Sequence, residues 1–196
     1  MTFYAFVRAI VYFPFHWLYR IRVEGIENVP MDRGFILCCN HRSNLDPFFI
    51  GVVLKQQLRF MAKIELFRIP LVNWFVRKVG AFPVNRGTGD TSAIDTAVQL
   101  VKDGQVLVIF PEGTRSLDGK LLRIKSGAMV VASKTESDVL PAVIKCKGRV
   151  RIFKRVTLRF GEIIKNVDIG IKDGSVKDIR NANELISRTF ASLLES

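Results

Sequence analysis

Cysteine and histidine are rare in this chain of 196 residues, which has three of the first and two of the second. Cys38 and Cys39 are adjacent in an apolar run, so we expect no disulfide framework and a reduced, cytosolic setting. The chain lacks a C-x-x-C pair, which together with so few histidines disfavours a zinc site. It also lacks internal repeats and a G-x-S-x-G motif, which disfavours a repeat protein and a serine hydrolase.

Acidic residues are also scarce, since 18 Asp and Glu stand against 30 Lys and Arg, a formal net charge of +12. The excess is concentrated in residues 55–86 and 139–196, and residues 145–159 contain seven cations and no acid. Such a distribution favours an anionic partner, which composition alone leaves open between nucleic acid, an acidic lipid surface and a phosphorylated substrate. The alternative is a solvated, charged face without a specific partner.

The N-terminal stretch differs in kind from the rest, because 8 of the 20 aromatic residues lie before Arg20. Arg8 and Pro14 interrupt the apolar run, which makes a spanning helix unfavourable. No small-residue cleavage site follows the run, as a signal peptide requires. Aromatic rings with a few arginines suit the headgroup boundary, so we predict an interfacial helix over residues 2–19. The alternative is a helix packed on the core of its own domain.

The pattern of apolar residues predicts strands and helices in alternation. The predicted strands are 35–39, 59–62, 80–84, 106–110, 139–144 and 155–160. The predicted helices begin at Asp46 and Asp90 or cover residues 69–79, 126–134 and 182–194. This order indicates an α/β domain with a layered, mixed and mostly parallel sheet flanked by helices. We expect a membrane-interfacial segment over residues 1–22 and the α/β domain over residues 23–196.

Chemistry-bearing side chains follow the first buried strand, in the segment Asn40-His-Arg-Ser-Asn-Leu-Asp46. Strand ends are the usual position of sites in α/β sheets. A histidine there can accept a proton near neutral pH, and a carboxylate five residues later can orient and stabilise its ring. Taken separately, His41 is equally consistent with an ordinary loop histidine and Asp46 with the N-cap of the next helix.

A second segment, Phe110-Pro-Glu-Gly-Thr-Arg-Ser116, directly follows the most apolar strand. Gly113 permits a tight turn, Glu112 can accept hydrogen bonds from a polyol, and Arg115 can bind a phosphate through two nitrogens. The alternative is a surface turn with a local Glu–Arg pair. Arg86 at the end of strand 80–84 is a further candidate phosphate ligand, and so is Lys63 after strand 59–62.

Together these segments resemble the glycerolipid acyltransferase family, which carries Asn-His-x4-Asp, a glycine-to-arginine block, Phe-Pro-Glu-Gly-Thr-Arg-Ser and a short apolar block with proline. The matching residues are 40–46, 80–86, 110–116 and 140–143, in the family's order and spacing. The resemblance covers roughly residues 20–162. In the last block Ala142 stands where the family usually has a larger β-branched residue.

The resemblance implies transfer of a fatty acyl group from acyl-CoA or acyl carrier protein to the sn-2 hydroxyl of 1-acyl-glycerol 3-phosphate (lysophosphatidic acid), giving phosphatidic acid. It implies His41 as general base and Asp46 as the residue that orients it. It implies that the acceptor substrate is bound by six residues, which are Lys63, Arg86, Glu112, Gly113, Thr114 and Arg115. It implies no metal or other cofactor beyond the thioester co-substrate. It also implies the cytoplasmic face of an anionic membrane as the location.

Two alternatives stay open at this point. Within the family, the acceptor can instead be glycerol 3-phosphate or a lysophospholipid. From another class, a basic nucleic-acid-binding module would explain the net charge. We expect no nucleic-acid partner, because no helix-turn-helix, RRM or zinc motif is present and the aromatic residues do not interleave with the basic run.

Overall fold

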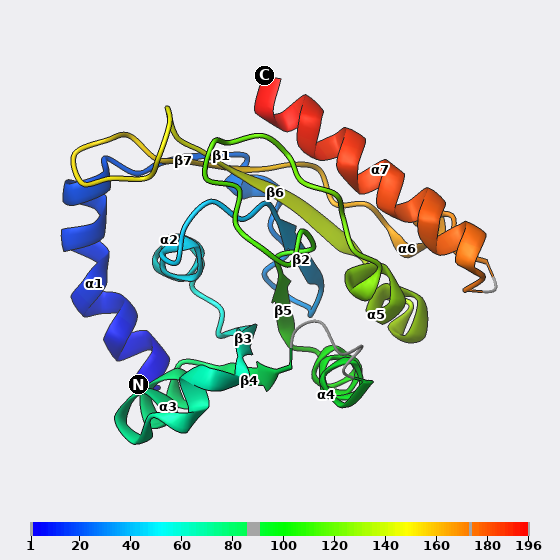
Figure 1. Cartoon of the computed structure of the whole chain (residues 1–196), viewed down its shortest axis with the longest axis horizontal. Helices are drawn as coiled ribbons and strands as arrows, with labels where there is room; N and C mark the ends of the chain where they lie inside the picture. Colours follow the sequence, from blue (N-terminus) through cyan, green and yellow to red (C-terminus); the bar gives the residue numbers. More distant parts are fainter. Residues whose placement is uncertain (1, 86–90, 173, 196) are drawn as a thin grey trace.

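The computed structural model describes residues 2–85, 91–172 and 174–195, and one seven-stranded sheet forms its centre (Figure 1). The strands are β1 (Arg22–Glu24), β2 (Ile36–Cys39), β3 (Leu58–Lys63), β4 (Ala81–Val84), β5 (Val106–Ile109), β6 (Val139–Lys145) and β7 (Thr157–Phe160). They lie in the order β1-β7-β6-β2-β5-β3-β4. All neighbours are parallel except β6 and β7, which confirms the predicted mixed, mostly parallel sheet.

Strand β2 lies inside the sheet, between β5 and β6. Ile36 is opposite Leu107 on one side and Val139 on the other. All four residues of β2 are buried because neighbouring strands cover its edges and helices cover its two faces. The chain therefore leaves the sheet at Asn40 from a fully enclosed position, which fixes the start of the segment that follows.

Helices cover both faces of the sheet. They are α1 (Phe3–Tyr19), α2 (Asp46–Val53), α3 (Pro70–Lys78), α4 (Thr91–Lys102), α5 (Gly127–Thr135), α6 (Asn166–Ile169) and α7 (Val176–Glu195), with 3-10 turns η1 (Ile26–Asn28) and η2 (Ile64–Arg68). Leu37 and Cys39 belong to the core cluster that includes residues of α1 and α2. Ile36 and Cys38 belong to the cluster that includes residues of α4, α5 and α7. This alternation follows from the two-residue period of a strand.

Several helices and strands differ from the sequence-based expectation. Helix α7 begins at Val176, six residues before the predicted start, because Ser175 accepts the Asp178 backbone N–H (3.3 Å) and Ile179 is buried. Strand β7 begins at Thr157 and not at residue 155. Strand β1 was not predicted, since three residues with one central valine carry almost no period-2 signal.

Helix α1 has a packed side and an exposed side. Thr2 caps its start by accepting the Ala5 N–H (3.2 Å). The ring of Phe15 lies 5.7 Å from that of Phe49 in α2, and the Tyr4 hydroxyl donates to the Gly51 carbonyl (3.2 Å). The exposed side chains are Phe6, Ile10, Tyr12, Phe13 and Trp17. The contacts of one side agree with the alternative of a helix packed on the core of its own domain, while the interfacial location of the exposed side stays a prediction.

Within residues 2–85, 91–172 and 174–195, no helix combines the length and the apolar content that crossing a bilayer requires. Pro14 lies inside α1 and so removes one backbone donor from its middle. The division of the chain at residue 22 stays a prediction.

Candidate active site

His41 and Asp46 meet in the segment between β2 and α2. Nδ1 of His41 lies 2.7 Å from Oδ2 of Asp46, whose side chain is completely buried. The same oxygen accepts the backbone N–H groups of Arg42 (2.6 Å) and Ser43 (2.9 Å). Because Nδ1 donates to this carboxylate, Nε2 of the neutral ring carries the lone pair that can accept a proton.

The local fold explains why Asp46 is available for this contact. Helix α2 begins at Asp46 itself, with Leu45 at the cap position and no side-chain cap. The interpretation of Asp46 as an N-cap is therefore wrong. Its carboxylate accepts hydrogen bonds from the preceding turn and from His41, and not from the backbone N–H groups of the first helical turn. Pro47 occupies the first turn, where its missing N–H leaves no hydrogen bond unmade.

The segment 110–116 packs directly against His41. The ring of Phe110 stacks on the imidazole with 4.3 Å between centroids and 22° between planes. The His41 backbone N–H donates to Oε1 of Glu112 (3.4 Å), and the Ser116 N–H donates to the His41 carbonyl (2.8 Å). Two motifs about 70 residues apart in sequence thus form one site, held through main-chain as well as side-chain contacts.

Glu112 is buried next to the His41 backbone, with only 2% of its surface exposed. Burial raises the pKa of Glu112 to about 7, although the backbone N–H groups of His41 and Leu122 act in the opposite direction. Both protonation states are therefore populated near neutral pH. In this position Glu112 supports the His41 backbone, and its predicted contact with a substrate hydroxyl stays a prediction.

Lys125 belongs to the site although sequence reasoning missed it. Its backbone N–H donates to the Pro111 carbonyl (2.8 Å). Gly113 has a φ of 69°, and a Cβ added there would lie 2.9 Å from Nζ of Lys125. The glycine therefore allows both the turn and the close approach of this ammonium group. Nothing in the local pattern around Lys125 indicated the contact, because it depends on how the loop after Ser116 returns to the sheet.

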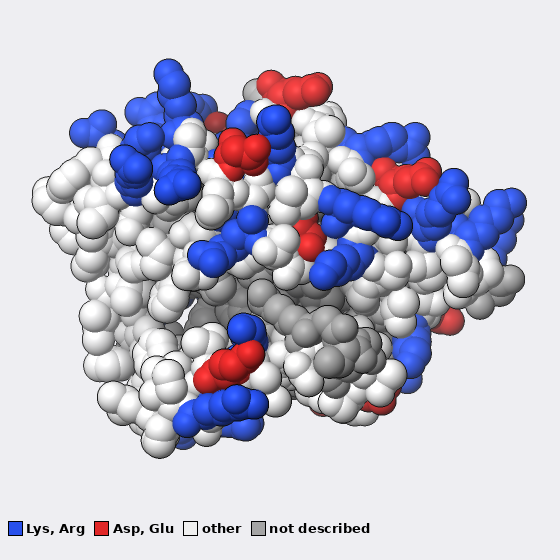
Figure 2. Space-filling view, in the orientation of Figure 1, with Lys and Arg blue, Asp and Glu red and all other residues white. Residues whose placement is uncertain are grey.

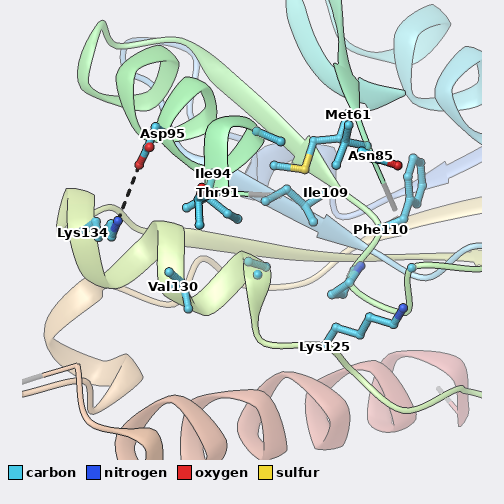
Figure 3. A pocket seen from close by; sticks show the side chains of 16 residues that line it. Met61, Asn85, Thr91, Ile94, Asp95, Ile109, Phe110, Lys125, Val130 and Lys134 are labelled. Carbon is cyan, nitrogen blue, oxygen red and sulfur yellow. Dashed lines mark ion pairs between the residues drawn. The ribbon is translucent and has the colours of Figure 1, made fainter. Parts of the chain in front are cut away.

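A pocket of about 520 Å³ opens beside Phe110, between α4 and α5 and next to the ends of β4 and β5. Met61, Ile94 and Ile109 contribute apolar walls, and Lys125 contributes a cation. Figure 3 shows Lys125 and Phe110 at one end of this pocket and the Asp95–Lys134 ion pair (3.7 Å) at the other. The size and the apolar lining are typical of small-molecule sites.

A second, smaller cavity of about 190 Å³ lies between α1, α2, α3 and the strands β3 and β4. Val11, Phe48 and Phe75 give it an apolar lining, and Asn44 and Pro47 place it next to the segment that carries His41 and Asp46. Its lining is suited to hydrocarbon.

Of the remaining predicted site residues, the structure describes three, and none of the three lines either cavity. Thr114 and Arg115 are exposed on the loop after Glu112. Lys63 is exposed at the end of β3 and forms an ion pair with Glu65 (3.0 Å). Arg86 lies outside the residues that the structure describes, so its predicted role is neither supported nor opposed by the geometry.

The chain is similar to a solved structure and to several sequence relatives. The crystal structure of the 1-acyl-sn-glycerophosphate (LPA) acyltransferase PlsC from Thermotoga maritima superposes with a TM-score of 0.78 at 32% identity, covering 97% of this chain and 79% of that one. The 1-acyl-sn-glycerol-3-phosphate acyltransferase of Bacillus subtilis is 37% identical over 123 residues, 62% of this chain. The enzyme of the same name from Streptococcus pneumoniae is 30% identical over 166 residues, 81% of this chain.

The matched part is a little over half of these relatives, since it spans 61% of the Bacillus protein and 61% of the Streptococcus protein. Residues 20–145 match the family described as Acyltransferase. That range includes His41, Asp46 and the whole segment 110–116, which is the part of the fold that forms the site. This chain therefore belongs to the Acyltransferase family.

Proposed function

We propose that this chain transfers a fatty acyl group from an acyl thioester to the sn-2 hydroxyl of 1-acyl-glycerol 3-phosphate, giving phosphatidic acid for phospholipid biosynthesis. The observation that carries the proposal is the contact of 2.7 Å between His41 and Asp46, beside the segment 110–116. The names of the relatives from Bacillus, Streptococcus and Thermotoga support the choice of acceptor.

The chemistry needs one base and no acyl-enzyme intermediate. Nε2 of His41 removes the proton of the acceptor hydroxyl while the hydroxyl oxygen attacks the thioester carbonyl carbon. Asp46 stabilises the imidazolium that forms. The tetrahedral intermediate then collapses, its C–S bond breaks, and the leaving thiolate takes the proton from His41. Base and carboxylate return to their starting states, and an ester replaces the thioester.

Cations at the site bind the phosphate of the acceptor. In this proposal Arg115 and Lys125 approach it from the loop and the pocket wall, with Arg86 and Lys63 as the further predicted ligands. Gly113 leaves space for Lys125, while Glu112 holds the backbone of His41 in place. The pocket of about 520 Å³ is large enough for the glycerol phosphate portion and its surroundings.

The net charge supports the proposed donor and location. Acyl-CoA and acyl carrier protein are both anionic, and so are phosphatidic acid and an acidic bilayer, which suits a chain of net charge +12. We propose a membrane-associated enzyme at the cytoplasmic face, with the exposed aromatic side of α1 in the headgroup region. The reaction transfers no electrons and so needs no redox cofactor, and we propose that the thioester co-substrate is the only other group it uses.

Two histidines allow a matched test of the base. His41→Ala should lower turnover by about 10³-fold with an unchanged fold, because the general base is removed. His16→Ala is the control and should retain turnover, because Nδ1 of His16 lies 2.8 Å from the Tyr12 carbonyl oxygen of its own helix, α1. Near-normal turnover in His41→Ala would eliminate this residue as the base.

The acceptor is tested separately with purified wild-type protein. The assay compares lysophosphatidic acid, glycerol 3-phosphate and lysophosphatidylcholine, each with acyl-CoA and with acyl carrier protein as donor. We expect phosphatidic acid from the first acceptor at the highest rate. Product from another acceptor and none from lysophosphatidic acid would overturn the proposed substrate and leave the acyltransferase chemistry in place.

A further inference from the structure

The loop between β6 and β7, residues 146–156, presents two apolar side chains to solvent. Ile152 is 54% exposed and Phe153 is 56% exposed. Phe153 also has a φ of 65°, in the left-handed region that is unfavourable for a bulky residue. Exposing a phenylalanine in a strained conformation is doubly unfavourable in water, so this loop tip suggests a partner that receives its side chains.

The β6–β7 loop is attached to the C-terminal end of α1. The Phe153 N–H donates to the Leu18 carbonyl (2.6 Å), and the Val156 N–H donates to the Tyr19 carbonyl (3.0 Å). The rings of Trp17 and Phe153 meet edge to face with 5.6 Å between centroids. Figure 1 shows the loop, in yellow, beside this end of α1 and far from α6 and α7. The loop tip and α1 therefore share one surface.

This surface continues along α1. Ile10, Phe13 and Trp17 are 58%, 76% and 64% exposed, and their spacing places them on one side of the helix. At the other end of α1 the ring of Phe3 lies 5.3 Å from that of Trp74 in α3. We call the set Ile10, Phe13, Trp17, Ile152 and Phe153 the apolar surface.

Cations border the apolar surface on the loop. The exposed ones are Lys147, Arg149, Arg151, Lys154 and Arg155. None of these five forms an ion pair with an acid among the residues the structure describes. Figure 2 shows Lys and Arg side chains gathered at the upper left, above an uncharged left edge where Figure 1 places α1.

We propose that the β6–β7 loop is a second membrane-docking element, which inserts Ile152 and Phe153 into the same anionic leaflet as α1 while its cations bind lipid phosphates. A bilayer offers hydrocarbon and anionic headgroups side by side, which matches an apolar surface with a cationic border. Nucleic acid offers the charge but no hydrocarbon for the exposed rings. The inference rests on the proposed function only for the presence of a membrane at this site.

The β6–β7 loop also contacts the catalytic segment. The guanidinium of Arg42, next to His41, donates to the Gly148 carbonyl (2.7 Å) and, at 3.5 Å, to that of Cys146. Gly119 leaves room for this side chain, since a Cβ there would lie 2.7 Å from a terminal nitrogen of Arg42. Docking of the loop thereby sets the distance between the His41 segment and the bilayer surface.

Binding to vesicles tests the proposal with the purified chain of 196 residues. The vesicles contain phosphatidylcholine alone or with phosphatidylglycerol. The double variant Ile152→Ser/Phe153→Ser should bind both kinds at least about tenfold more weakly. Arg149→Gln/Arg151→Gln should bind the anionic vesicles about 25-fold more weakly and the neutral ones as the wild type does. Matched controls are Val167→Ser, with 81% of the valine exposed on α6, and Lys177→Gln on α7.

A depth measurement tests insertion directly. The wild type contains two tryptophans, Trp17 and Trp74, and both are replaced by phenylalanine. Phe153→Trp in that background should be quenched by brominated acyl chains when vesicles are added, whereas Val167→Trp should not. Equal quenching at both positions, or none at residue 153, overturns the proposal.

Three outcomes distinguish the docking role of the loop from the proposed function. Vesicle binding that is insensitive to both loop variants, with unchanged thermal unfolding, overturns the docking role and leaves the proposed function untouched. Strong vesicle binding through the loop without phosphatidic acid production overturns the proposed function alone. A dimer in solution that the loop variants dissociate identifies a second copy of the chain as the partner and overturns the docking role.

Discussion

Replacing Glu112 by glutamine gives the sharpest test of how the site is built. Glu112 is 2% exposed, and burial raises its pKa from 4.5 to about 7. Between these two pH values the folded chain binds more protons than the unfolded chain, so stability falls as the pH rises through this window. The full difference corresponds to about 3 kcal/mol of unfolding free energy, lost by the time the pH exceeds the folded pKa.

Glu112→Gln removes the titration and keeps an oxygen that can accept the His41 N–H. The expected result is a wild type that loses about 3 kcal/mol relative to the variant between pH 4.5 and about pH 8. Urea unfolding of both proteins in the same detergent, at several pH values, measures this difference. A difference in unfolding free energy that is the same at every pH reflects the buried amide and gives no information about the protonation of Glu112.

Glu184→Gln, on the exposed side of α7, is the control and should follow the wild type to within about 0.5 kcal/mol at every pH. The reasoning would be refuted if the unfolding free energies of Glu112→Gln and the wild type changed in parallel with pH. That result would mean that water reaches the Glu112 carboxyl in the folded protein and that burial does not dominate its pKa.

Two further predictions concern Asn40, which precedes His41 in the sequence, and Lys125 in the pocket wall. Asn40→Ala should lower the unfolding free energy by about 2 kcal/mol, because the buried Asn40 amide accepts the Ile144 N–H (2.7 Å) and donates to its carbonyl (3.3 Å). Urea unfolding checks it, and an equal loss in exposed Asn44→Ala would contradict it. Lys125→Met should raise the KM for lysophosphatidic acid at least about tenfold, by loss of a charged hydrogen bond to phosphate. Steady-state kinetics check it against exposed Lys120→Met, and an unchanged KM would remove Lys125 from the phosphate site.

The sheet was predictable because its central strands are short, wholly apolar runs. Strands β2 and β5 are buried on both faces, so each residue in them carries the same signal. The contact between His41 and Asp46 was predictable as well, since five residues across a turn bring the two side chains within reach. Its distance of 2.7 Å agrees with that expectation, while the roles of the two residues as base and orienting group stay predictions.

Contacts between distant segments were beyond sequence reasoning. Asn40 binds the backbone of Ile144, 104 residues away, and Glu112 binds the backbone of His41, 71 residues away. Glutamate in a turn is usually solvated, so its burial depends on the three-dimensional arrangement of two loops. Lys125 was missed for the same reason, because the close approach at Gly113 appears only after the chain has folded.

The sheet order also sets the timing of assembly during synthesis. The first strand, β1, has a single neighbour, and that neighbour is the last strand, β7. Helix α1 can contact α2 once residue 53 has left the ribosome, but β1 has no strand to pair with until residues 157–160 have been made. Until then α1 is held to the growing domain by α2 and, once residues 70–78 have been made, by α3, while its exposed rings are free to meet a lipid surface before the sheet is complete.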